Sequence, residues 1–368
     1  IIIALFAPIL GAIADRGSLR KKLLIAFAFL GMVMTAGLWF VHQGEWRLAI
    51  FFYVIATMGF MAGNIFYDSL LPIVAEKDEV HFVSALGYSL GYLGGGILFL
   101  VNVLMYLNPE FFGIPDSSTA VRLSFLSVAL WWAIFTLPVI FFLPEPIGNK
   151  TIPVAEAIKE GFFQLKETYE SIKEMKIIGT FLVAFWFYED GVGTIVRMAG
   201  KIASSLGFSA GDIIIALLMV QFIGFPASLL YNYFGNKIGA KRAVLVAIIG
   251  YGVITLLGFF MTSIIHFYIL AALIGIFQGG IQSLSRSLFT RLVPKGKEAE
   301  FFGFYNMLGK FAAVLGPIMV GSITVMTGNP RIGILSIVAL FALGGILLSK
   351  VDFSEGERIA NNFGKINF

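Results

Sequence analysis

Apolar runs long enough to cross a lipid bilayer fill most of this sequence. A helix needs about 20 apolar residues to span the hydrocarbon core of a membrane. Of the 368 residues, 58% are hydrophobic and 13% are charged, whereas soluble domains carry about 25% charged residues. The sequence therefore predicts an all-α, multi-pass integral membrane protein.

Eleven predicted spans cover the chain. The first, Ile1–Ala14, is too short to cross alone and begins without a methionine or a basic lead-in. We interpret this start as a truncation, and one restored helix would give two bundles of six. The other predicted spans are Leu23–Val41, Leu48–Val74, Val83–Tyr106, Val121–Leu143, Ile177–Val196, Asp212–Phe234, Ala243–Thr262, His266–Thr290, Phe301–Met326 and Ile332–Leu348.

Lysine and arginine gather in alternate loops, which predicts the orientation. The basic set of loops, which includes Arg20, Lys77 and Lys241, is cytoplasmic by the positive-inside rule. The C-terminus is then cytoplasmic, and a bacterial inner membrane is the expected location. The predicted domains are an N-terminal bundle at 1–143 that lacks its first helix, a cytoplasmic linker with an amphipathic helix at 144–176, a C-terminal six-helix bundle at 177–350 and a cytoplasmic tail at 351–368.

The amino-acid composition argues against a metal site, a cofactor site and a nucleic-acid site. The chain has no cysteine, and its three histidines, His42, His81 and His266, lie near predicted span ends. We therefore expect no metal and no cofactor. The net charge of +4 comes from short loops between spans, so nucleic acid is not an expected partner. No nucleophile–base pair is visible, and we expect a monomeric protein in the lipid bilayer that is not an enzyme.

An internal repeat joins two distant stretches, Gly59–Gly96 and Gln278–Pro317. In each stretch an apolar helix carries polar residues on one face, a short charged loop follows, and a glycine lies early in the next helix. Repeats of this size within hydrophobic spans are typical of transporters. The polar residues on these helix faces are Asn64 and Asp68 in the first stretch, and Gln278, Gln282 and Arg286 in the second.

Asp68 and Arg286 occupy matching positions in this repeat, both near the predicted cytoplasmic mouth. A charge inside an apolar span is rare and costly, which makes each a candidate functional residue with a partner to be found. We predict that the two approach each other in a cytoplasmic gate, together with Asn64. The alternative is that each caps a helix or reaches the membrane surface separately.

Further polar residues reach the middle of the bilayer at a rise of about 1.5 Å per residue. We predict that Lys310 faces a central cavity and neutralises Asp190, or an anionic group of a substrate, because an unpaired lysine at this depth is costly. The alternative is a structural pair that only fixes helix rotation. The predicted substrate and coupling residues are Trp186, Glu189, Asp190, Gln278, Gln282, Asn306 and Lys310.

A loop with the letters GAIADRGSLRKK ends the first predicted span. The loop is similar to the G-x-x-x-D-R-x-G-R-R signature of the major facilitator superfamily, which it matches at Gly11, Asp15 and Arg16. A serine replaces the second glycine of the signature. On this motif the chain resembles that superfamily. The resemblance implies two six-helix bundles around a central cavity. It also implies that Asp15 braces the outward-facing state near the start of the Phe301 helix or the end of the Leu70 helix. The alternative is a polar turn that ends a helix.

Three further motifs carry a narrower resemblance: QSLSRS from Gln282, EAEFFGFY from Glu298 and YEDGV from Tyr188, together with Lys310. They are similar to the bacterial and fungal relatives of the autophagy-linked vacuolar amino-acid effluxers. The resemblance covers nearly the whole chain and implies export of amino acids or similar small solutes. The family's polar first helix has no counterpart in this sequence, so its site residues are not carried over.

The sequence thus predicts secondary transport of a small polar solute by alternating access. Protons are the expected coupling ion, through Glu189 and Asp190, and uncoupled export is the alternative. Rival hypotheses are a membrane scaffold or signalling subunit on the same fold, and a lipid flippase or lipid-handling enzyme. A transporter predicts a solvated polar cavity lined from both halves, whereas a scaffold predicts that Gln278, Gln282 and Lys310, with Asp190, face a packed interior.

Overall fold

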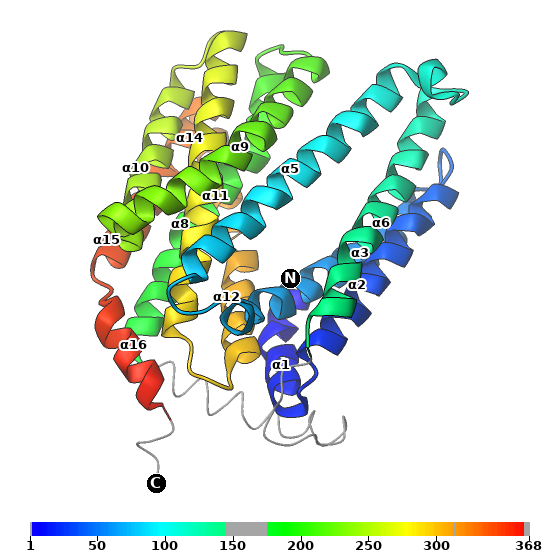
Figure 1. Ribbon diagram of the computed structural model, residues 1–368. Coiled ribbons are helices and arrows are strands. Elements are labelled where there is room, and N and C mark those ends of the chain that lie inside the picture. Colours follow the sequence, from blue (N-terminus) through cyan, green and yellow to red (C-terminus); the bar gives the residue numbers. More distant parts are fainter. Residues whose placement is uncertain (1, 145–174, 313, 364–368) are drawn as a thin grey trace.

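The computed structural model describes residues 2–144, 175–312 and 314–363, and every regular element in these ranges is helical (Figure 1). Nine helices in this described part are long and apolar enough to cross a membrane, which confirms the predicted all-α, multi-pass fold. The elements are α1 (Ile2–Gly17), α2 (Arg20–Gly37), η1 (Leu38–Phe40), α3 (Trp46–Ser69), α4 (Leu71–Val74), α5 (Val80–Leu107), η2 (Pro109–Phe112), α6 (Ser117–Phe142), α8 (Lys176–Ser205), α9 (Ala210–Ile238), α10 (Ala240–Phe259), α11 (Ile264–Leu292), α12 (Glu298–Phe311), α13 (Leu315–Thr327), α14 (Pro330–Leu335), α15 (Val338–Ser349) and α16 (Phe353–Asn362).

Three predicted spans are each divided into a pair of helices. The predicted span Leu48–Val74 consists of α3 and α4, Phe301–Met326 consists of α12 and α13, and Ile332–Leu348 consists of α14 and α15. Pro317 lies in the first turn of α13. A proline is tolerated in the first turn of a helix, but inside one continuous helix it would remove a backbone hydrogen bond. The helix therefore ends before Pro317, and a second helix begins. The amphipathic helix expected at 144–176 lies outside the described residues.

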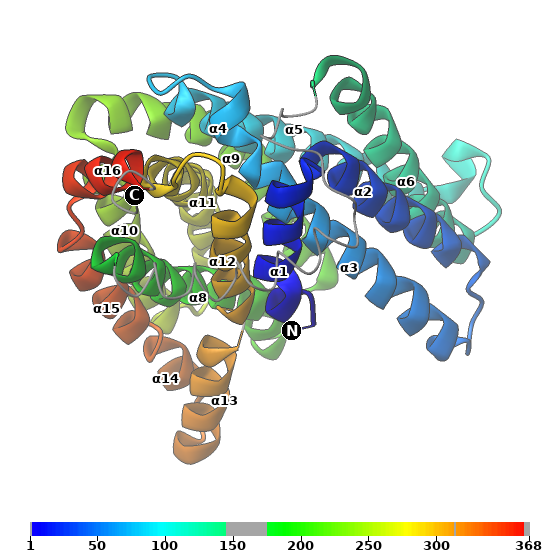
Figure 2. The same ribbon diagram turned by 90° about the horizontal axis from the view of Figure 1, so that it is seen from below.

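The helices form two groups that diverge toward one end and meet at the other (Figure 1). In the first group α2 packs along α3 and α6; in the second, α8 packs on α15 and α10 on α11. The groups meet where α1 contacts α12 and where α5 contacts α9 and α11. Figure 2, which looks at the end where the groups meet, shows α1 lying between α12 and α3. We call this the closed end.

The C-terminal segment adds a helix at the closed end that the sequence prediction of a tail did not include. Helix α16 packs on α11. Its Glu357 accepts hydrogen bonds from Arg291 (2.8 Å) in the second group and from Lys77 (2.9 Å) in the first. These two bonds, first that from Arg291, hold the pKa of Glu357 below its usual range. Because the side chains are partly exposed, the two ion pairs are weak contacts between the groups.

The contact between α1 and α12 depends on glycines that let the two backbones touch. A Cβ built at Gly11 would collide with the carbonyl of Ala299, and one at Gly303 would lie 2.6 Å from the carbonyl oxygen of Ala7. Such close approach of helices is typical of membrane proteins, where small residues lie at helix interfaces. Gly11, which matches the loop signature described above, is therefore also a packing residue.

Substitution of Gly303 by valine should weaken the closed end. The added side chain meets backbone atoms that cannot rotate away, and overpacking of this kind costs about 1–3 kcal/mol. Thermal unfolding of the purified protein should show a lower midpoint. Gly321→Val in α13 is the matched control, because a Cβ at Gly321 meets no atom within 4 Å. Equal midpoints for the two variants would contradict this account.

Candidate functional site

Asp15 joins the two helix groups at the closed end. Its carboxylate accepts the backbone N–H of Ala299 (3.1 Å) and of Glu300 (2.9 Å) in the first turn of α12. Arg20 donates to Asp15 (2.7 Å) and to Glu298, which extends the link. A carboxylate at a helix N-terminus is stabilised by the unpaired N–H groups and by the helix dipole. The structure thus places Asp15 at the start of the Phe301 helix, one of its two predicted positions. The side chain of Arg16 lies outside what the structure describes.

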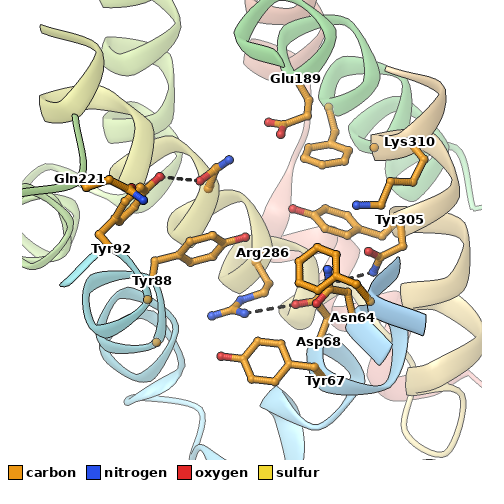
Figure 3. Close-up of a pocket in the computed structure, with 17 residues that line it drawn as sticks. Asn64, Tyr67, Asp68, Tyr88, Tyr92, Glu189, Gln221, Arg286, Tyr305 and Lys310 are labelled. Atoms are coloured by element: carbon orange, nitrogen blue, oxygen red, sulfur yellow. Dashed lines mark hydrogen bonds and ion pairs between the residues drawn. The ribbon is translucent and has the colours of Figure 1, made fainter. Parts of the chain in front are cut away.

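Above this contact, both helix groups line a central cavity of about 530 Å³ (Figure 3). Its residues come from α3 and α5 on one side and from α8, α9, α11 and α12 on the other. The cavity contains four charged side chains, of which two are basic and two acidic. The lining residues are Phe60, Asn64, Tyr67, Asp68, Gly87, Tyr88, Gly91, Tyr92, Phe185, Glu189, Gln221, Gln282, Arg286, Tyr305, Asn306, Gly309 and Lys310.

The floor of the cavity is a buried ion pair between the two groups. Arg286 of α11 donates to Asp68 of α3 (3.2 Å), and Asn306 of α12 donates to the other carboxylate oxygen (2.9 Å). Arg286 also donates to the hydroxyl and to the carbonyl of Ser84, each at 3.0 Å. Its guanidinium lies over the ring of Tyr88, 4.6 Å from the centroid. The structure brings Asp68 and Arg286 into the direct contact that their repeat positions predicted.

Glu189 and Lys310 project into the cavity from α8 and α12 (Figure 3). In the part of the chain that the structure describes, Lys310 has no carboxylate within the 4.0 Å of an ion pair, and the acidic groups that act on it electrostatically are Asp68 and then Glu189. Lys310 in turn is the charged group that acts most strongly on Glu189. Besides the Asp68–Arg286 pair, the cavity therefore holds one carboxylate and one ammonium group that interact electrostatically but form no ion pair with each other.

The predicted pairing of Lys310 with Asp190 is wrong. Asp190 is fully buried, and both of its carboxylate oxygens accept the backbone N–H of Gly316 at 3.0 Å, while Thr194 donates at 3.3 Å. Gly316 lies in the first turn of α13, so Asp190 caps the helix that begins after the break. Successive helix residues point about 100° apart, and it is Glu189 that faces the cavity.

Two other predicted site residues also lie away from the central cavity. Gln278 lines a second, mainly apolar cavity of about 310 Å³ within the second helix group. Trp186 is half-buried and stacks on Phe187 with ring centroids 5.3 Å apart. Gln282, one turn from Gln278, does line the central cavity and accepts a hydrogen bond from Tyr92 (2.9 Å).

Sequence reasoning missed the contribution of α5. Tyr88 and Tyr92 line the cavity, and Ser84 binds Arg286. The internal repeat contained the signal, because Gly87–Tyr88 matches Gly303–Phe304 at the opening of the helix that carries Lys310. Among the described residues, no group of three or more histidine, cysteine, aspartate or glutamate side chains is arranged to hold a metal ion.

Comparison with solved structures identifies the fold. The major facilitator transporter FucP in its outward conformation gives a TM-score of 0.68 at 14% identity, over 95% of this chain and 89% of that chain. The proton:xylose symporter XylE gives a TM-score of 0.70 at 14% identity, over 98% and 88%. At these identities the similarity concerns the fold alone. The chain therefore has the fold of the major facilitator transporters, with a polar cavity between its two helix groups.

Sequence comparison narrows the class to one family. A family model described as "Vacuole effluxer Atg22 like" matches residues 1–361. The uncharacterized MFS-type transporter YxiO of Bacillus subtilis is 36% identical over 351 residues, which is 95% of this chain and 82% of that protein. Autophagy-related protein 22 of Saccharomyces cerevisiae is 24% identical over 397 residues, 94% of this chain and 74% of that protein. The chain belongs to the Atg22-like family, as its motifs predicted.

The contact of Asp190 with the first turn of α13 predicts a structural role for this residue. Asp190→Ala removes the acceptor of a buried backbone N–H, and an unsatisfied buried donor costs about 1–3 kcal/mol. The thermal unfolding midpoint should fall. Because Asp190 does not line the cavity, the affinity of the folded protein for a ligand should change by no more than about twofold. Asp190→Asn, which keeps one oxygen acceptor, should recover part of the midpoint. A loss of ligand binding at unchanged stability would contradict this role.

Proposed function

We propose that this protein is a secondary transporter for a small zwitterionic, amino-acid-like solute. The observation that carries the proposal is the pair of charges that α8 and α12 present to one cavity. Lys310 would bind the carboxylate of the solute, and Glu189 would bind its ammonium group. Because Arg286 is already paired with Asp68, the charges left for a ligand sum to zero, which matches a zwitterion rather than an anion or a cation.

Transport by alternating access requires that the cavity open to each side in turn. The basic residues of the loops at the closed end favour a cytoplasmic location for this end, so the present arrangement corresponds to an outward-facing state. The contact of Asp68 with Arg286, flanked by Asn64, would act as the cytoplasmic gate, and the contacts of Asp15 would brace it. We place the protein as a monomer in a bacterial inner membrane with a cytoplasmic C-terminus, and we propose export as its direction.

Proton coupling would use Glu189 rather than Asp190. Glu189 reaches the cavity, whereas Asp190 is committed to the start of α13. When a bound ammonium group leaves, the carboxylate of Glu189 loses a neutralising partner, and a proton can take its place. Outward movement of the solute would then be exchanged for inward movement of a proton.

Neutral substitutions at the two cavity charges test the proposal. Lys310→Met and Glu189→Gln should each reduce amino-acid counterflow in proteoliposomes at least tenfold, since each removes one charged contact to the solute. Lys310→Arg should retain part of the activity. The control is Lys237→Met at the end of α9, outside the cavity. Undiminished counterflow in Lys310→Met, or counterflow of no amino acid by the wild-type protein, would overturn the assignment.

A charge exchange tests the gate. Asp68→Arg and Arg286→Asp each leave two like charges facing one another in a buried site, so each should abolish transport. The double variant restores opposite charges and should recover a measurable part of it. Uptake by the three variants at matched expression decides the matter. If the double variant stays inactive while it folds and inserts normally, the two residues do not act as one gate.

The scaffold hypothesis predicts that the polar residues of the predicted site face a packed interior rather than a cavity. Asp190 and Gln278 lie away from the central cavity, as a scaffold would have it. Gln282 and Lys310, however, line a polar cavity shared by both helix groups. A protein without a ligand has no need of a lysine and a glutamate that face a polar cavity at this depth without forming an ion pair with each other, so the transporter is favoured.

A further inference from the structure

Helix α5 forms the wall of the central cavity that lies opposite Lys310. It contributes Gly87, Tyr88, Gly91 and Tyr92. Figure 3 shows Tyr88 and Tyr92 on the opposite side of the cavity from Lys310. The α5 wall bears no formal charge, unlike the floor and the opposite side.

Three other glycines of α5 have a packing reason to be glycine. A Cβ at Gly87 would lie 3.0 Å from the hydroxyl of Tyr67, and a Cβ at Gly96 would lie 3.1 Å from Gln221. Gly95 meets Gln221 at 3.2 Å in the same way. Each of these glycines makes room for a neighbouring helix.

Gly91 has no such reason. A Cβ at this position would meet no atom within 4 Å, and the residue is exposed to the cavity. It lies inside a regular helix, where glycine costs about 1 kcal/mol relative to alanine, and its backbone is not among those with a positive φ. Neither helix packing nor backbone geometry therefore accounts for the missing side chain, and what the glycine provides is free space in the cavity.

This space lies at the depth of the charged pair. Gly91 is 11 residues beyond the first residue of α5, Lys310 is 12 beyond that of α12, and Glu189 is 13 beyond that of α8. All three helices begin at the closed end (Figure 1). At about 1.5 Å per residue, the three residues lie roughly 16–20 Å along their helices. A solute held at one end by Lys310 and Glu189 would extend its other end toward Gly91.

We propose that the α5 wall around Gly91 is the subsite for the uncharged side chain of the solute, and that Gly91 sets the largest side chain accepted. This inference rests on the proposed transport of a zwitterion. The charged ends of the solute bind the second helix group, and its side chain binds the first. Both groups then hold one small molecule, and the aromatic rings of Tyr88 and Tyr92 flank the side chain on either side of the glycine.

Counterflow of a homologous series tests the size limit. The probes are glycine, alanine, 2-aminobutyrate, norvaline and norleucine, which differ by single methylene groups. Gly91→Ala and Gly91→Val should shift the preference toward shorter members, with a change in the ratio of norleucine to alanine transport of about 10-fold or more, since one methylene in a pocket is worth about 10–200-fold. Gly252→Val is the matched control, because a Cβ at Gly252 in α10 also meets no atom within 4 Å but lies outside the cavity.

A second measurement does not depend on transport by a bulky variant. The chain contains no cysteine, so Gly91→Cys creates a single thiol on the α5 wall. A small charged thiol reagent should label it from the outside, and a transported amino acid should slow the labelling, longer side chains more than glycine.

The outcomes separate this inference from the proposed function. If the wild-type protein moves members of the series but Gly91 variants change all of them equally, or if no amino acid slows labelling of Gly91→Cys, the subsite is wrong while the zwitterion assignment stands. If the wild-type protein moves no member of the series, both are overturned. A selective loss of the longer members, absent in Gly252→Val, supports the subsite.

Discussion

The cost of a charge inside a membrane governs how this chain is arranged. An ion in the bilayer must find a counter-charge, a set of hydrogen-bond donors or water. Arg286 finds Asp68 and Ser84 in a contact between the two helix groups, and Asn306 donates to the same carboxylate of Asp68. Asp190 finds the first turn of α13. Glu189 and Lys310 face the cavity, and they give it one acidic and one basic group besides the Asp68–Arg286 pair.

The contact between the two helix groups combines two kinds of interaction with different consequences. The crossing of α1 and α12 depends on backbone contact at Gly11 and Gly303, which is short-range and is lost by a small separation. The links of Asp15 to α12 and of Arg286 to Asp68 are charged, and they can reform with water when the groups move apart. A closed end built in this way is tight, and it fits the gate proposed above.

Much of the fold was predictable because its signals are local. Apolar runs of about 20 residues define spans whatever their neighbours are. The breaks before α4, α13 and α15 and the helix α16 were not predicted. Pro317 was a local sign of the break before α13. The internal repeat also placed Asp68 and Arg286 at matching positions, so for these two residues the spacing along the chain carried the three-dimensional information. For Asp15 the family resemblance of the loop implied two positions, and the structure shows the one at the start of α12.

The sequence by itself determined that several charges lie inside the membrane and that each needs a partner. Only the tertiary structure decided which partner each one has. Glu189 and Asp190 are neighbours in the chain, but the turn of about 100° between them sends one to the cavity and the other to α13. The start of α13 offers N–H groups to Asp190 only because α8 packs beside it. Such a choice depends on helix rotation and packing, and these are set by contacts between residues far apart in the sequence.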